Sequence, residues 1–145
     1  RSTLMRSSAA SDVYKRQTGM TMGDDLQKVL SKDTDGLLTY EYIANHMGHC
    51  DDEMGELADN IIKVDHKGQI TVSAALYLHS TDSEKYAPYV AKLIQASLEK
   101  DREHSYIADL LPGIWGEDYK EHVAEYNASS DLFRRIYKRV YAEGI

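Results

Sequence analysis

The side chains best suited to bind a metal gather near the middle of the first half of the chain. His46 and His49 are three residues apart, a spacing that places both on one face of a helix, and Cys50 and Asp51 follow directly. Imidazole, thiolate and carboxylate are the donors that zinc prefers. No HExxH motif or CxxC pair accompanies them. His46 and His49 are therefore a candidate Zn²⁺ site, and a solvated helix end is the alternative.

Two acid and histidine pairs have helical spacing, Asp101 with His104 and Asp118 with His122. Such pairs can serve as acid and base or hold a metal, but in an acidic chain they are also expected by chance. The sequence has no Walker loop, dinucleotide glycine motif, GxSxG or nucleophile with an adjacent base. The motifs therefore give no support for an enzyme.

Oxygen ligands alternate along the turn that begins at Ser31. Asp33 and Asp35 follow at the next two odd positions, then Gly36 for a sharp turn and Thr39. This segment resembles an EF-hand calcium loop, and the resemblance assigns Ca²⁺ ligands to Ser31, Asp33, Asp35 and Thr39.

The loop departs from that family in two places. Ser31 stands where the family has Asp, and Tyr42 stands at the twelfth position, where a bidentate Glu is needed. Glu41 comes one residue too early. Because the lost carboxylate removes two of the oxygens that Ca²⁺ requires, we expect weak calcium binding at best.

A fainter copy of this turn follows 32 residues later, with Asp65, Gly68 and Thr71 in place of Asp33, Gly36 and Thr39. Two EF-hand-like units would pair through short strands at Leu38 and Ile70. The segment resembles tellurite-resistance TerB-like helical domains about as closely as it resembles EF-hands, since those domains also have DG-x-hydrophobic-T-x-E turns. A plain pair of helix hairpins is the third interpretation.

Tyrosine dominates the aromatic residues, with 11 Tyr against one Phe and one Trp. Tyrosine buries a large ring while its hydroxyl stays near water or a partner. A groove lined by Tyr86, Tyr89, Tyr106 and Trp115 is the functional hypothesis, and packing at the rim of the core is the alternative.

The last helix, expected at about residues 130 to 142, separates apolar from basic side chains. Its basic face is expected to point away from the core and to bind an acidic or phosphate-bearing partner, with a solvated face as the alternative. That face consists of Arg134, Arg135, Lys138 and Arg139.

The elements that must position these residues are helices. Helix-period apolar spacing occurs in nearly every segment after Thr18, and the chain has only two prolines. We predict an all-α, single compact domain of about six to seven helices, with one short strand pair joining the 33–39 and 65–71 turns.

The first helix is expected over about residues 24 to 32. Thr39 is expected to cap the second helix and Asp51 the third. The segment 70–80 is expected to begin as a short extended stretch, because Ile70 and Val72 favour strands, and to continue as a helix.

A long helix is expected in the second half. Thr81 and Glu84 have the spacing of a capping box, and Pro88 would fall in the first turn, where its missing N–H costs little. The apolar face then continues through Leu111, until Pro112 ends the helix.

Residues 1–17 differ from the rest of the chain. They are rich in Ser and Arg, and the stretch SSAASDVYKRQ resembles translated sequencing-adapter read-through. We therefore expect a non-native segment followed by one domain, residues 18–145. That domain has 13 basic and 23 acidic side chains, a net charge of −10.

The charge and composition limit the function. A strongly acidic domain is unsuited to general nucleic-acid binding or to anionic membranes. No apolar run approaches the roughly 18 to 20 residues that span a membrane, and the lone Cys50 favours a reducing compartment such as the cytoplasm.

The leading hypothesis is a binding or adaptor module for a protein or small ligand, with no cofactor. The alternatives are a Ca²⁺- or Zn²⁺-responsive domain, and a small metal-dependent hydrolase that uses His46 and His49.

Overall fold

The computed structural model describes residues 22–142, and the elements in this range are all helical. The predicted all-α fold is confirmed. The expected segment 1–17 lies outside the described residues. The helices are α2 (Met22–Lys32), α3 (Leu37–Asn45), α4 (Met54–Val64), α5 (Gln69–Thr81), α6 (Ala87–Lys100), α7 (Leu110–Trp115), α8 (Val123–Ser129) and α9 (Asp131–Tyr141). Short 3-10 turns η1 (Asp51–Glu53), η2 (Ile107–Asp109) and η3 (Tyr119–His122) precede α4, α7 and α8.

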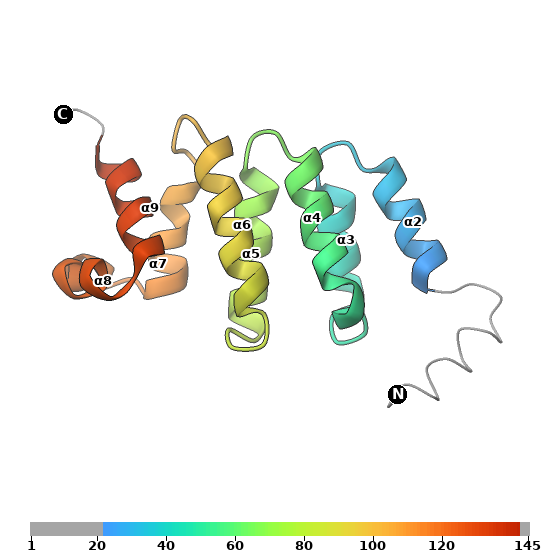
Figure 1. Ribbon diagram of the computed structural model, residues 1–145, viewed down its shortest axis with the longest axis horizontal. Helices are drawn as coiled ribbons and strands as arrows, with labels where there is room; N and C mark the ends of the chain where they lie inside the picture. The colour runs from blue at the N-terminus through green and yellow to red at the C-terminus, as the bar shows by residue number, and fades with distance from the viewer. Residues whose placement is uncertain (1–21, 143–145) are drawn as a thin grey trace.

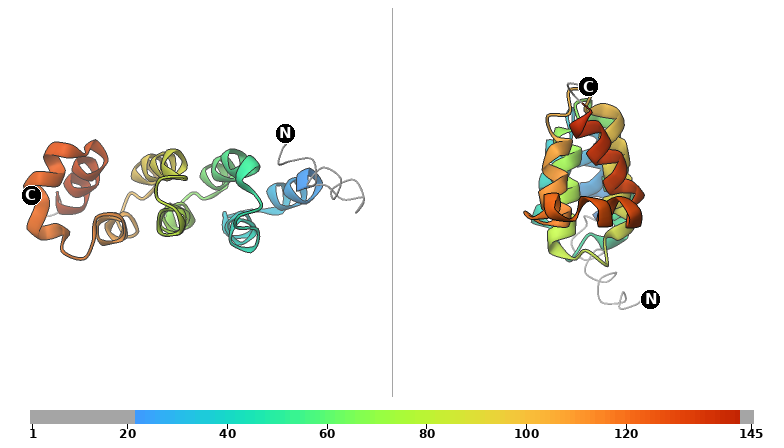
Figure 2. Two further views of the ribbon diagram at one scale, coloured as in Figure 1. Left: turned by 90° about the horizontal axis from the view of Figure 1, so that it is seen from below. Right: turned by 90° about the vertical axis from the view of Figure 1, so that its left-hand side faces the viewer.

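Antiparallel helix pairs follow one another in a row, from α2 at one end to α8 and α9 at the other (Figure 1). The view from below shows two layers, one with α3, α5 and α7 and the other with α4, α6 and α9 (Figure 2). α3 packs on α4 and α5 on α6, while α3 contacts α5 and α4 contacts α6 along the row. Each hairpin therefore packs on the next one, as in proteins built from stacked helical repeats.

An aspartate organises the turn between α2 and α3. Oδ1 of Asp33 accepts hydrogen bonds from the backbone N–H groups of Asp35 (3.2 Å) and Gly36 (2.8 Å). Oδ2 accepts from both the backbone N–H (2.8 Å) and the hydroxyl of Thr39. Gly36 has φ +100°, a conformation that favours glycine. The Asp, Gly and Thr of the sequence motif thus form one closed turn.

The same turn recurs 32 residues later. Oδ1 of Asp65 accepts from the N–H of Gly68 at 3.0 Å, and Oδ2 accepts from the N–H and the hydroxyl of Thr71, both at 2.8 Å. Asp101 begins a third turn, where its carboxylate accepts from three backbone N–H groups, those of Ser105, Tyr106 and Ile107. All three turns lie along one edge of the row (Figure 1).

The core is one continuous apolar cluster between the two layers, and its most deeply buried members come from nearly every hairpin. The largest fully buried side chains are Phe133, Ile43, Met54, Leu57, Ile61, Leu78, Leu93, Ile94, Leu98, Ile107 and Leu110. Among the described residues, no helix has the length and apolar character needed to cross a bilayer.

Two expectations about the first hairpins are wrong. Leu38 and Ile70 lie inside α3 and α5, so no strand pair joins the turns in residues 22–142, and α5 is helical from Gln69 onward. Thr39 lies within α3 and does not cap it, because its hydroxyl donates to Asp33 in the preceding turn.

The long helix expected through Leu111 is also wrong. α6 ends at Lys100, because the buried Asp101 draws the following backbone N–H groups into a turn. Pro112 lies within α7 and does not terminate the preceding helix. The capping box is absent as well: Thr81 is the last residue of α5, although Pro88 does lie in the first turn of α6.

Candidate functional site

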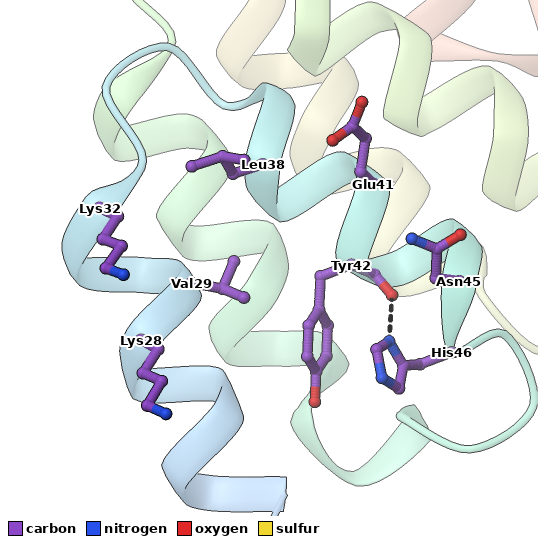
Figure 3. Close-up of a pocket in the computed structure, with 8 residues that line it drawn as sticks. All are labelled: Lys28, Val29, Lys32, Leu38, Glu41, Tyr42, Asn45 and His46. Carbon is purple, nitrogen blue, oxygen red and sulfur yellow. Dashed lines mark hydrogen bonds between the residues drawn. The ribbon is translucent and has the colours of Figure 1, made fainter.

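A pocket opens between α2 and α3, at the end of the row opposite α9 (Figures 1 and 3). Its volume is about 330 Å³. α2 supplies one wall and α3 the other, and Val29 and Leu38 lie between the two helices in Figure 3. The lining residues are Lys28, Val29, Lys32, Leu38, Glu41, Tyr42, Asn45 and His46.

The floor of the pocket is apolar. Val29 of α2 is half-buried, and Leu38 of α3 is 44% exposed. The ring of Tyr42 is buried and stacks on His46 with 4.0 Å between the centroids. Nδ1 of His46 lies 2.9 Å from the backbone carbonyl oxygen of Tyr42 (Figure 3), which holds the imidazole in this position.

Charged side chains form the rim. Lys28 and Lys32, one helical turn apart on α2, are both exposed, and Glu41 is exposed on α3. None of these three side chains forms an ion pair with the side chains of residues 26–142. An apolar floor with two lysines at its rim suits an apolar ligand that also carries acidic groups.

The 32-residue repeat relates the pocket face of α3 to a packed face of α5. Leu38 corresponds to Ile70 of α5, and a Cβ placed on Gly36 would lie only 3.1 Å from Cγ2 of Ile70. Asn45 corresponds to Tyr77, whose ring packs edge-on against Tyr40, with centroids 5.9 Å apart. On α5 these positions therefore pack against the preceding hairpin. On α3 the same positions line the pocket, and α2 faces them across it.

The calcium ligands expected at the first turn have other partners. Both oxygens of Asp33 are occupied by N–H and O–H donors, and the carboxylate is only 6% exposed. Thr39 donates to Asp33 and accepts from Nδ2 of Asn60 at 2.9 Å. Oδ1 of Asp35 accepts from the N–H of Leu37. The hydroxyl of Ser31, exposed on α2, donates to the carbonyl oxygen of Lys28.

The pKa of Asp33 reflects this environment. Burial alone raises the pKa of the carboxyl, but the hydrogen bonds from Thr39, Gly36 and Asp35 outweigh it and hold the pKa below its ordinary value. The charged form of Asp33 is thus stabilised by the turn itself. In the described part of the chain, no group of three or more His, Cys, Asp or Glu side chains could hold a metal ion.

The two histidines of the candidate zinc site do not share a helix. α3 ends at Asn45, so that His46 is its C-cap and His49 lies in the turn beyond Gly48. Their expected placement on one helical face is therefore wrong. Cys50 is fully buried, and burial, with smaller contributions from Asp51 and Glu53, raises the pKa of its thiol to about 11.

The four aromatic residues proposed to line a groove are dispersed. Tyr86 is buried, and its hydroxyl donates to Oδ1 of Asp51 at 2.7 Å. Burial raises the pKa of Tyr86 to about 12. Half-buried Tyr89 lies beside Gly55, and Tyr106 lies at the third turn.

Trp115, the fourth of these residues, belongs to a separate aromatic cluster. Its ring packs edge-on against Phe133, with centroids 5.1 Å apart, and Tyr126 and Tyr137 pack on the same phenyl ring. The hydroxyls of Tyr119 and Tyr141 also meet, at 2.7 Å. This cluster packs α8 against α9.

α9 has the expected division between an apolar and a basic face, and it begins after Ser130, whose hydroxyl caps the N–H of Phe133. Three of the four basic residues, however, have partners within the protein. Arg134 and Arg135 pair with Asp131. Arg139 donates to the carbonyl oxygen of Leu98 in the last turn of α6. Arg139 is exposed, as expected of a side chain that points away from the core, but its guanidinium bonds to α6.

Lys138, the fourth basic residue of that face, is exposed.

The two acid and histidine pairs, Asp101 with His104 and Asp118 with His122, lie in different parts of the fold. The carboxylate of Asp101 is buried and bonded to its own turn. Exposed Asp118 lies 3.3 Å from His122, near the start of α8.

The residue pattern alone did not single out Lys28, Val29 or Leu38 as site residues. A signal existed only for Leu38, because the 32-residue offset aligns it with Ile70, a half-buried position that packs against the first turn. Comparison with known proteins adds no information on this site: no protein-family model, curated protein or solved structure matches the chain significantly.

Proposed function

We propose that this chain is a non-enzymatic protein-binding module, and that the pocket between α2 and α3 receives an amphipathic helix of a protein partner. The observation that carries the proposal is the equivalence between Leu38 and Ile70. Ile70 is half-buried against Gly36 in the turn before α3, whereas Leu38, at the same repeat position, is 44% exposed in the pocket.

The surroundings support a helix as the occupant. Helix-in-groove recognition uses apolar anchors spaced by about one turn, and Leu38, Tyr42 and His46 offer complementary positions along α3. Lys28 and Lys32 favour a partner helix with acidic residues beside its apolar stripe. Leu38 is one of the three most exposed large apolar residues in the described range, and it lines the pocket, which is typical of an interaction surface.

The opposite end of the row differs. α9 turns its exposed face, with Arg134, Arg135 and Lys138, to solvent. In stacked-repeat proteins a polar outer face ends the stack, whereas an apolar end face needs a further partner. The contrast between the two ends supports binding at the α2 and α3 end.

The test uses a fluorescently labelled, stapled helical peptide with leucines at positions i, i+4 and i+7 and glutamates beside them. Binding is measured by anisotropy at 100 mM NaCl, a salt concentration at which the Debye length is about 10 Å. Leu38→Asp should weaken binding at least tenfold. Leu37→Asp is the matched control, since Leu37 is 43% exposed, is adjacent in sequence and does not line the pocket.

Charge is tested in the same way. Lys32→Glu should weaken binding, whereas Lys63→Glu, an exposed lysine on α4, should not. Absence of peptide binding, or equal effects of the two leucine variants, would refute the proposal. Tighter binding by a chain without residues 1–17 would assign the pocket to the chain's own N-terminal residues and would also refute it.

A further inference from the structure

A second cavity lies between the second and third turns, on the edge of the row where the aspartate turns are found. Its volume is about 510 Å³. His66 and Lys67 come from the turn between α4 and α5, and Lys100, Arg102 and Tyr106 come from the end of α6 and the turn that follows. This cavity shares no lining residue with the pocket between α2 and α3.

The cavity concentrates positive charge in an acidic chain. Lys67 and Arg102 are exposed and Lys100 is half-buried, and none of the three forms an ion pair with any carboxylate in residues 26–142. The chain as a whole carries a net charge of −7. Three unpaired cations around one cavity are therefore a local exception, and they attract anions.

The acidic residues in the cavity oppose this charge only in part. Asp101 is 3% exposed, and its oxygens accept from the N–H groups of Ser105 (3.1 Å), Tyr106 (2.6 Å) and Ile107 (2.9 Å). Its negative charge is thus directed toward the backbone of its own turn. Glu103 is exposed at the rim.

The basic residues are an addition to the repeat and not a requirement of it. His66 and Lys67 occupy the positions that Thr34 and Asp35 occupy in the first turn. Both turns close with the same pattern of hydrogen bonds. Because the fold of the turn is the same with Asp35 as with Lys67, the basic side chain serves something other than the turn.

We propose that this cavity binds the phosphate of a phosphorylated side chain on a protein partner. The guanidinium of Arg102 can bind two phosphate oxygens at once, and Lys67 and Lys100 add point charges from both sides of the cavity. A phosphorylated residue presents about two negative charges and three acceptor oxygens, which matches three cations that form no ion pair with the side chains of residues 26–142. The half-buried ring of Tyr106 provides an apolar contact for the rest of that side chain.

The probe is a labelled glycine-serine peptide with one phosphoserine, with the unphosphorylated and the Glu peptides for comparison, at 100 mM NaCl. Only the phosphopeptide should bind. Lys67→Ala and Arg102→Ala lie on different turns, and each should weaken binding at least threefold and the pair at least tenfold. The pair Lys63→Ala and Lys120→Ala removes the same charge at exposed positions outside the cavity and should leave the affinity unchanged.

Each other outcome overturns the proposal. Equal weakening by the two double variants would show general charge attraction. Equal binding of the Glu peptide would show an acidic-peptide site. Tighter binding of ATP than of the phosphopeptide would assign the cavity to nucleotides. Circular dichroism of each variant confirms that it is folded, so that loss of binding can be attributed to the cavity.

Discussion

At the scale of single residues, the buried aspartates of the three turns are the most informative side chains. The carboxylates of Asp33, Asp65 and Asp101 are at most 6% exposed, and each accepts several hydrogen bonds from its own turn. A buried charge is tolerated when such donors compensate for its lost hydration. These residues therefore close the turns, and the Asp recurs in each turn because its carboxylate accepts the hydrogen bonds that hold the turn together.

Asp33→Asn should reduce the free energy of unfolding by about 1.5 to 3 kcal/mol at pH 7, the usual contribution of hydrogen bonds to a charged group. The pKa of Asp33 is lowered in the folded state, so its contribution is present above the unfolded pKa and is lost as the pH falls through the folded pKa. Urea unfolding from pH 7 down to pH 3 should show the difference between wild type and variant shrinking below about pH 4.

Asp35→Asn is the control, because the side chain of Asp35 is exposed and accepts only the N–H of Leu37. It should change the stability by less than about 0.5 kcal/mol. A difference for Asp33→Asn that stays constant with pH would contradict the assignment of a stabilised charge at this position.

At the scale of the elements, the turn glycines set how closely the hairpins approach. Gly36 and Gly48 have similar positive φ values, +100° and +90°. A Cβ on Gly36 would meet Ile70 of the next hairpin at 3.1 Å, whereas a Cβ on Gly48 would have nothing within 4 Å. Alanine substitutions at the two glycines can therefore separate two contributions to the loss of stability. One is the positive φ, which both share, and the other is the close packing, which only Gly36 has.

Gly48→Ala should destabilise the fold by about 1 to 2 kcal/mol, the cost of a left-handed conformation for a residue with a Cβ. Gly36→Ala should cost at least about 1 kcal/mol more, since it also displaces Ile70. Chemical denaturation of the two variants measures both effects. Equal losses would show that α5 does not pack closely on the first turn.

The contact between α9 and α6 gives a second prediction at this scale. The guanidinium of Arg139 donates to the carbonyl oxygen of Leu98, in the last helical turn of α6, where carbonyl groups lack helical partners. Arg139→Ala should reduce the free energy of unfolding by about 1 kcal/mol. Arg135→Ala, which removes only an exposed 3.9 Å pair with Asp131, should have almost no effect on thermal unfolding. The reverse order would contradict this helix contact.

At the scale of the whole molecule, the hairpins are not equally supported. α6 packs on α4, α5, α9 and η2, whereas the main contact of α2 is α3. In a stack of repeats each element depends on its neighbours, so an element with a neighbour on one side only opens more readily.

Hydrogen exchange measured by mass spectrometry should therefore show faster exchange of the backbone amides of α2 than of α6. The stapled helix that occupies the pocket between α2 and α3 should slow exchange in α2 and leave α6 unchanged, because binding stabilises the elements that form the site. Uniform exchange across the row would indicate that the whole chain opens as one cooperative unit.

The sequence by itself determined the helical class and, to within two residues, the extent of α2 and α9, because apolar periodicity is a local property of a helix. It also contained the repeated Asp, Gly and Thr turn. The long helix predicted through Leu111 is wrong at Asp101, where the apolar spacing continues in the sequence although the backbone turns. A carboxylate that accepts three N–H groups overrides the local pattern there.

Only the tertiary structure decided what the chemically suitable residues do. The oxygens of Asp33 accept hydrogen bonds from their own turn. The end of α3 at Asn45 leaves His46 and His49 without a common helix. Leu38 differs from Ile70 in nothing that a sequence pattern records, since both are apolar residues at the same repeat position. Ile70 is half-buried against the preceding hairpin and Leu38 is exposed in the pocket, because packing depends on which element lies next in space, and that neighbour is set by the stacking of the hairpins.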